Sequence, residues 1–344
     1  MSTLPSPSVT PSVAVCIPSY NRADFLPETL ATLYGQGYPN LTVAILDDGS
    51  KDNTAEVIHT LQQQYPNLLY FHKANEGEAK TVDFGFNKIK SGEIPADYFA
   101  FVNSDDPVMP GWLQPLVDAM ESSDKPDIVY PDWAMIDVDS NYIRDHRSFA
   151  PSLAYSLARG IAPSGPGVLF RTTSLQRVAS LRPRLYRYCG DAFTWYMLLA
   201  DFAFKHVPQV LASWRIHAGG ITSESNLKAR AAEQPAMMAD LLDTIKTNPV
   251  AQQMRRKAMT AAAMQAGLIL LKAGQASGAN YVLQAFTSTP LHTLYLMGAY
   301  IASLPPRIVS LLRYKLFNRN LNRDWQHATP PVTIPLRTPL KKAA

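Results

Sequence analysis

The sequence contains little of what marks secreted, membrane-spanning or nucleic-acid-binding proteins. Its 344 residues include only two cysteines, Cys16 and Cys189, which form no metal-spaced pair and fit a reducing compartment best. No uninterrupted apolar run reaches the roughly 20 residues that a membrane-spanning helix needs. The formal net charge of +4 is small, and no dense basic run precedes the C-terminal third, so nucleic-acid binding is not expected.

Residues 1–12 lack the basic start and the apolar core of a signal peptide. They are rich in Ser, Thr and Pro, and we expect them to form a disordered lead-in. The protein should therefore be cytoplasmic, with any membrane contact peripheral. An apolar content of 47% with 17% charged residues is ordinary for a folded chain.

The first half alternates short apolar runs with helical patterns, which is the rhythm of an α/β sheet. Each run is apolar throughout, as expected for strands covered on both faces. The predicted strands are residues 13–17, 42–46, 68–71, 98–102 and 128–130. Helices are expected between them, because apolar residues there recur at helical spacing.

The composition changes near residue 225. From residue 226 the chain is rich in Ala, Met and Leu, reads as helical and is divided by prolines. We expect a catalytic α/β domain over 13–225, an α-helical region over 226–327 and a disordered tail over 328–344.

Three polar clusters follow predicted strands, at residues 18–22, 47–50 and 103–106. In a parallel sheet, ligands bind beyond the carboxyl ends of the strands. Turn formation explains any one cluster. It explains poorly why two of them contain adjacent carboxylates, which repel each other unless a positive group neutralises them. A divalent cation beside a diphosphate would do so, and oxygen ligands suit magnesium or manganese.

These residues resemble the glycosyltransferase family 2 pattern with its GT-A, Rossmann-like fold for nucleotide-diphospho-sugars. Residues 17–22 resemble that family's first strand and donor loop, and residues 47–50 its nucleoside-recognition turn. Residues 103–106 resemble its DxD metal motif. Farther on, Gly190-Asp191 resembles the acidic catalytic motif, and Arg215-Ile216-His217 resembles the closing Arg-x-His element. The resemblance covers roughly residues 13–223.

Two positions depart from the family pattern. The family often has Asp at the position of Asn103 and Asn at the position of Asp83. Because Asp105 is retained, the resemblance still implies an active enzyme.

The resemblance implies an inverting hexosyltransferase that moves a sugar from a nucleotide diphosphate, with UDP as the default, to an acceptor hydroxyl. It implies a Mn²⁺ or Mg²⁺ ion held by Asp105, Asp106 and His217, with Asp191 as general base. Its candidate donor-binding residues are Pro18, Tyr20, Arg22, Asp47, Asp48, Asp83, Asn103, Ser104 and Arg215. The implied acceptor is a glycan or a lipid-linked molecule, in surface glycan or polysaccharide synthesis.

Other interpretations of the same residues remain open. Asp191 could only cap its helix, and His217 could be a structural side chain. The whole chain could be a catalytically inactive nucleotide-sugar or carbohydrate-binding module, an idea that Asn103 keeps open. A sugar-phosphate nucleotidyltransferase is less favoured, because residues 18–22 contain no glycine for a phosphate loop.

The C-terminal region contains an apolar run at residues 294–304, followed by an amphipathic pattern over 307–319 with arginines mostly outside its apolar face. Such a segment can lie in the headgroup region of a membrane. We therefore expect residues 294–319 to be a candidate for peripheral membrane contact. The alternatives are that the helix packs back on the fold or forms a homo-oligomer contact.

Overall fold

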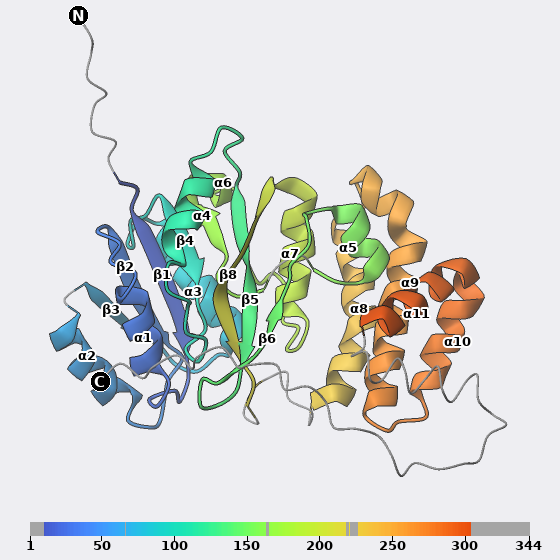
Figure 1. Cartoon of the computed structure of the whole chain (residues 1–344), viewed down its shortest axis with the longest axis horizontal. Coiled ribbons are helices and arrows are strands. Elements are labelled where there is room, and N and C mark those ends of the chain that lie inside the picture. Colours follow the sequence, from blue (N-terminus) through green and yellow to red (C-terminus); the bar gives the residue numbers. More distant parts are fainter. Residues whose placement is uncertain (1–9, 66, 163–164, 218–219, 221–225, 304–344) are drawn as a thin grey trace, which may run out of the picture.

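The computed structural model describes residues 10–65, 67–162, 165–217, 220 and 226–303. The predicted tail over 328–344 and residues 304–327 of the helical region lie outside the described residues, as does most of the predicted lead-in. Figure 1 shows an α/β unit in the N-terminal part of the chain with a group of helices packed beside it.

The described residues form one mixed sheet of eight strands in an α/β fold. Its first half is parallel, in the order β3 (Leu68–His72), β2 (Leu41–Asp47), β1 (Val13–Ser19) and β4 (Tyr98–Phe101). These four strands and β5 correspond to the five strands predicted from the sequence. Because β1, β2 and β4 run in the same direction, the loops that follow them meet at one edge of the sheet.

The second half of the sheet is built around β5 (Ile128–Ile136). The short strand β7 (Leu169–Arg171) lies antiparallel between β4 and β5, and β6 (Tyr142–His146) is also antiparallel to β5. The long strand β8 (Phe204–Arg215) runs parallel to β5. Its end therefore returns to the edge where the polar loops lie.

Both faces of the parallel half are buried, which explains the uninterrupted apolar runs. Alternate residues of β1 and β2 pack against α1 (Leu26–Tyr34), α2 (Thr54–Gln64) and α4 (Leu113–Met120) on one face. The residues between them pack against α3 (Glu78–Lys90) on the other face. At Gly85 of α3, an added Cβ would lie 2.3 Å from a Leu46 methyl group, so the close approach of helix and strand requires glycine.

The helical region consists of α8 (Leu227–Thr244), α9 (Pro249–Lys272), α10 (Gly278–Ser288) and α11 (Pro290–Ser303). It joins the α/β unit through α5 (Leu153–Arg159) and α7 (Gly190–Asp201), which share an apolar cluster with α8 and α9. A four-residue helix, α6 (Thr172–Leu175), follows β7. None of the described helices is both long enough and apolar enough to span a bilayer.

Candidate active site

The polar loops after β1 and β2 are hydrogen-bonded to each other. The backbone N–H of Asn21 donates to the Ser50 hydroxyl (2.9 Å), and the Lys51 N–H donates to the Asn21 side-chain oxygen (2.8 Å). Asn21 has a positive φ of 51°, a conformation that asparagine tolerates better than most residues. The donor loop at residues 18–22 and the turn at 47–50 therefore form one unit.

Asp48 lies buried beneath this unit and organises the loop before α3. Its carboxylate accepts hydrogen bonds from the backbone N–H groups of Glu76 (2.9 Å) and Gly77 (2.7 Å) and from the Lys73 ammonium. Burial alone would raise the pKa of Asp48, but these hydrogen bonds, first among them that of Lys73, hold it below its usual value. Beside it, Gly49 has a φ of +74°, and a Cβ there would lie 2.8 Å from the Asn75 nitrogen.

Asp47 is also buried and bonded within the chain, to the Ser50 N–H (2.9 Å) and the Tyr70 hydroxyl (2.8 Å). Both carboxylates of the predicted nucleoside-recognition turn thus hold the loops together. A hydrogen bond that Asp47 or Asp48 accepts from a nucleoside would have to be made alongside these internal bonds.

Asp105 is the point at which three separate loops meet. Its carboxylate oxygen lies 3.0 Å from Nε2 of His217, which follows β8, and 3.5 Å from Nε of Arg22, which follows β1. The Phe25 ring packs at 5.5 Å from the His217 imidazole, measured between centroids. All three polar side chains are partly exposed. The structure therefore brings three predicted site residues together at the edge of the sheet.

Asp106 differs from its neighbour because it points into the protein. One oxygen accepts a hydrogen bond from the backbone N–H of Arg215 (2.7 Å), and the other accepts from the Asn103 side chain (2.8 Å). Burial, followed by the nearby charge of Asp105, raises the pKa of Asp106 above its usual value. Each oxygen of Asp106 thus accepts a hydrogen bond from within the chain, and the expected metal contact of Asp106 would have to be made alongside these bonds. Asp105 is the carboxylate of this pair that is open to a ligand.

Arg215 is likewise buried, and its side chain is only 1% exposed. Its guanidinium donates to the Glu28 carboxylate (2.8 Å) and lies over the Phe25 ring. It also donates to backbone carbonyls and one hydroxyl, belonging to Asp105, Asp137, Val138 and Ser140. These bonds join β8, α1 and the β5–β6 turn, and the expected contact of Arg215 with the diphosphate would have to be made alongside them.

Replacing each of these two arginines by methionine should separate their roles. Arg215→Met should lower the free energy of unfolding by about 2–3 kcal/mol, because it leaves Glu28 and three part-buried carbonyls without the donor that joins their segments. Arg22→Met should cost less than about 1 kcal/mol, since the Arg22 side chain is 29% exposed and its ion pair is long. Urea unfolding of both variants measures the difference. Unchanged stability of Arg215→Met combined with weaker nucleotide binding would show that this guanidinium is a ligand contact after all.

Asp83 connects α3 to the loop that precedes α7. Its carboxylate accepts hydrogen bonds from the backbone N–H groups of Leu181 (2.8 Å) and Arg182 (3.1 Å) and from the Ser180 hydroxyl. The residue predicted to contact the donor is thus engaged in positioning the loop that leads to Asp191.

Asp191 lies in the first turn of α7, where a negative charge is favoured by the helix dipole. The N-cap position is occupied by Cys189, so Asp191 is not the capping residue itself. Its Oδ1 accepts the backbone N–H of Ala192 (2.7 Å), and its side chain is exposed. The carboxylate is therefore accessible from solvent.

The remaining predicted donor-site residues lie in the same loops. Tyr20 and Asn103 are exposed, and Pro18 is half-buried at the end of β1. Ser104 is buried, and its carbonyl accepts the Thr29 hydroxyl (2.9 Å), which ties the loop after β4 to α1.

Sequence reasoning missed the supporting residues Phe25 and Glu28. Both lie at the start of α1, directly after the donor loop, and an acid in the first turn of a helix is an ordinary sequence feature. It also missed Asp132, a buried carboxylate on β5 that binds His206 (2.8 Å) and Arg147 (2.9 Å). The predicted strand at 128–130 ended two residues too early to include it.

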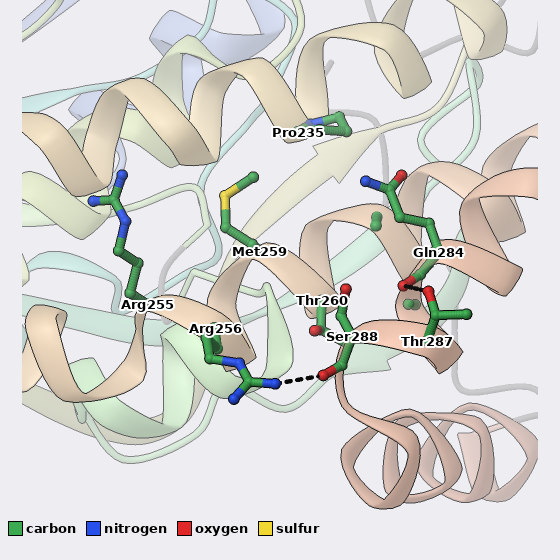
Figure 2. A pocket seen from close by; sticks show the side chains of 10 residues that line it. Pro235, Arg255, Arg256, Met259, Thr260, Gln284, Thr287 and Ser288 are labelled. Carbon is green, nitrogen blue, oxygen red and sulfur yellow. Dashed lines mark hydrogen bonds between the residues drawn. The ribbon is translucent and has the colours of Figure 1, made fainter.

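A cavity of about 380 Å³ lies elsewhere, between α8, α9 and α10. Figure 2 shows Arg255, Arg256 and Gln284 among the side chains that line it, with Arg256 donating to the Ser288 carbonyl (2.8 Å). This cavity contains none of the predicted site residues. The candidate active site is therefore the open edge of the sheet around Asp105.

Residues 14–183 match the family model for glycosyl transferase family 2. The chain belongs to this family. The matched segment includes the loops after β1, β2 and β4, whereas Asp191 and His217 lie beyond it.

Two curated relatives of this glycosyltransferase are themselves glycosyltransferases without an assigned reaction. One, from Nostoc sp., is 28% identical over 235 residues, which is 64% of this chain and 71% of the relative. Another, from Rickettsia typhi, is 25% identical over 226 residues, covering 62% and 67% of the two chains.

A solved structure shares the GT-A fold of this glycosyltransferase. It is a mannosyltransferase from Pyrobaculum calidifontis in complex with GDP-mannose and Mn²⁺. The TM-score is 0.51 at 16% identity, and the alignment covers 91% of this chain and 89% of the other. The similarity extends over the helical region as well as the sheet.

Proposed function

We propose that this chain transfers a sugar from a nucleoside diphosphate to an acceptor hydroxyl with inversion of the anomeric configuration. The observation that carries the proposal is the meeting of Asp105, His217 and Arg22 at the carboxyl ends of β1, β4 and β8. A carboxylate, an imidazole and a guanidinium, all partly exposed, form a set of groups suited to a diphosphate and its counterion.

Arg22 is the guanidinium proposed to contact the diphosphate. Its Nε lies at 3.5 Å from Asp105, which is long for an ion pair, and the group retains solvent exposure. It can therefore turn toward a phosphate oxygen, to which its planar donors are well matched. Tyr20 and Pro18, in the same loop, would form the wall on which the nucleoside rests.

Asp105 and His217 are the residues that would hold a divalent cation, Mn²⁺ or Mg²⁺. Among the described residues no group of three His, Cys, Asp or Glu side chains gathers around a point suited to a metal ion. Two protein ligands nevertheless fit such an ion, because magnesium-type sites take their remaining oxygens from water and substrate phosphates. When bound, the ion would neutralise the negative charge of the diphosphate leaving group. The mannosyltransferase with the similar fold was solved with Mn²⁺, which supports the assignment.

Asp191 is the proposed general base. Its exposed carboxylate would take the proton of the acceptor hydroxyl as that oxygen forms a bond to the anomeric carbon. The bond between the anomeric carbon and the diphosphate oxygen breaks on the opposite side, and the nucleoside diphosphate leaves with the bonding electrons. One displacement inverts the configuration, so an α-linked donor yields a β-glycoside.

The donor is proposed to be a UDP-linked hexose, with GDP-linked sugars as the alternative because the mannosyltransferase binds GDP-mannose. A hydrolysis and binding screen of UDP-, GDP- and dTDP-sugars, with and without Mn²⁺, tests both points. NMR of the released or transferred sugar then reports its anomeric configuration. A retained configuration would contradict the inverting mechanism. Donor binding without turnover of any donor and acceptor pair would favour an inactive binding module.

A further inference from the structure

The charges of this protein are divided unevenly along the chain. Residues 244–344 carry 13 Lys and Arg against a single acid, Asp324, whereas residues 1–243 carry 19 Lys and Arg against 27 Asp and Glu. The small total charge therefore conceals an acidic N-terminal part and a strongly basic C-terminal part. Such an uneven distribution of charge affects which partners the protein binds rather than how it folds, because it creates an electrostatic potential of one sign over one part of the molecule.

The basic part contains a long segment without any charge. No Asp, Glu, Lys or Arg occurs between Lys272 and Arg307. In the structure this segment forms α10 and α11, which Figure 1 shows at the end of the molecule, away from the first strands of the sheet. A solvated helix pair normally carries charged side chains on its outer face.

One face of α11 packs against the fold. Leu296 is buried in a cluster with residues of α9 and α10, and Nε2 of His292 lies 2.8 Å from the Ala158 carbonyl at α5. Of the candidate segment 294–319, only residues 294–303 are described, and this part has an inner face that packs against the rest of the chain.

The opposite face is apolar and exposed. Leu291 is 84% exposed and Leu294 53%, and Ile301 follows at helical spacing. Leu283 of the neighbouring helix α10 is also largely exposed. Exposed apolar side chains that gather on one face mark a contact with another apolar phase or surface.

Cationic side chains lie on α9, the helix against which α11 packs. Lys257 of α9 is exposed and lies near His292 of α11. Burial of the His292 imidazole lowers its pKa, and the positive charge of Lys257 lowers it further. Arg255 and Arg256 precede it and are also exposed, with Arg255 in a surface ion pair to Asp243.

We propose that α10 and α11 dock on an anionic lipid surface. Leu291 and Leu294 would enter the boundary between headgroups and acyl chains, while the cations of α9 lie among the lipid phosphates. A second copy of the chain fits this face less well, because two strongly basic C-terminal parts would then be brought together. The inference is independent of the transfer reaction, since it rests on charge and exposure alone.

Flotation with vesicles of phosphatidylglycerol and phosphatidylcholine tests the proposal on the full chain without any donor. Binding is expected at low ionic strength, should fall strongly at about 0.5 M NaCl, where charges are screened within a few ångströms, and should be weak on phosphatidylcholine alone. The double variant Leu291→Ser, Leu294→Ser should have an affinity for the anionic vesicles that is lower by a factor of about ten or more, because it removes two large apolar side chains from the lipid contact.

The control is Val138→Ser with Ile143→Ser, which removes two other exposed apolar side chains, 51% and 48% exposed, near the β5–β6 turn. It should float like the unmodified chain, and equal thermal unfolding of both double variants checks that each is folded. The proposal fails if the unmodified chain stays in solution with anionic vesicles at low salt, or if both double variants float equally well. A dimer in solution that Leu291→Ser, Leu294→Ser dissociates, with no flotation, would assign the face to a second copy instead.

Discussion

Replacing Asp191 by asparagine should lower kcat by about 10² or more while the affinity for the donor nucleotide stays unchanged. Asparagine has almost the same shape but cannot accept the proton of the acceptor hydroxyl. The Asp191 carboxylate is exposed in the first turn of α7 and is bonded only lightly, to its neighbour's N–H. Its replacement should therefore leave the structure of the donor loops intact. Steady-state kinetics with the donor found in the nucleotide-sugar screen, together with calorimetric binding of the nucleotide, measure both quantities.

The control for this variant is Asp201→Asn at the other end of α7. It removes an acid from the same helix, at a position far along the chain from the donor loops, and should retain normal kinetics. Loss of donor affinity at unchanged kcat would make Asp191 a donor-site residue. Normal kinetics in Asp191→Asn would leave it as a first-turn acid that stabilises its helix.

Asp105→Ala should remove metal-stimulated turnover, with a loss of at least about 10²–10³ in kcat/KM, and should weaken nucleoside diphosphate binding in Mn²⁺. The side chain lies between His217 and Arg22, and its removal leaves only the imidazole to hold a cation. Binding of the nucleotide at increasing Mn²⁺ concentrations measures the effect. Activity that stays near normal and still rises with Mn²⁺ would overturn the assignment of this residue.

The neighbouring carboxylate supplies the matched control. Asp106→Asn places an amide where the Arg215 N–H and the Asn103 side chain both need an acceptor. It should therefore lower the free energy of unfolding by about 1–3 kcal/mol. The Mn²⁺ concentration for half-maximal nucleotide binding should change much less than in Asp105→Ala. The pair of variants separates metal binding from the support of the loop.

Strands β6, β7 and β8 could not be predicted from the sequence, because pairing with a neighbouring strand, rather than a continuous apolar pattern, places them in the sheet. β6 is largely exposed along its length, and β7 has only three residues. β8 contains Pro208 and charged residues, yet it lies in the sheet because β5 pairs with it through two irregularities in register. None of these segments has the continuous apolar pattern that two covered faces impose on β1 and β2.

The polar clusters presented a different difficulty, because adjacent residues of the same type have opposite environments. Asp105 and Asp106 are both aspartates after β4, but Asp105 is partly exposed whereas Asp106 is buried. Arg22 and Arg215 both belong to family motifs, but Arg215 is buried. Sequence position cannot distinguish the two members of each pair. The difference lies in whether the side chain is hydrogen-bonded to donors or acceptors from segments that are distant in the chain.

The sequence by itself determined the α/β class, the five strands of continuous apolar residues and the loops in which the site lies, because hydrophobic periodicity and strand ends are local properties. The tertiary structure decided which charged side chains of those loops remain free for a ligand. It also decided that Leu291 and Leu294 face outward from α11 while Leu296 faces inward. These outcomes depend on contacts between segments far apart in the chain, such as the 112 residues that separate Asp105 from His217, and no local pattern records them.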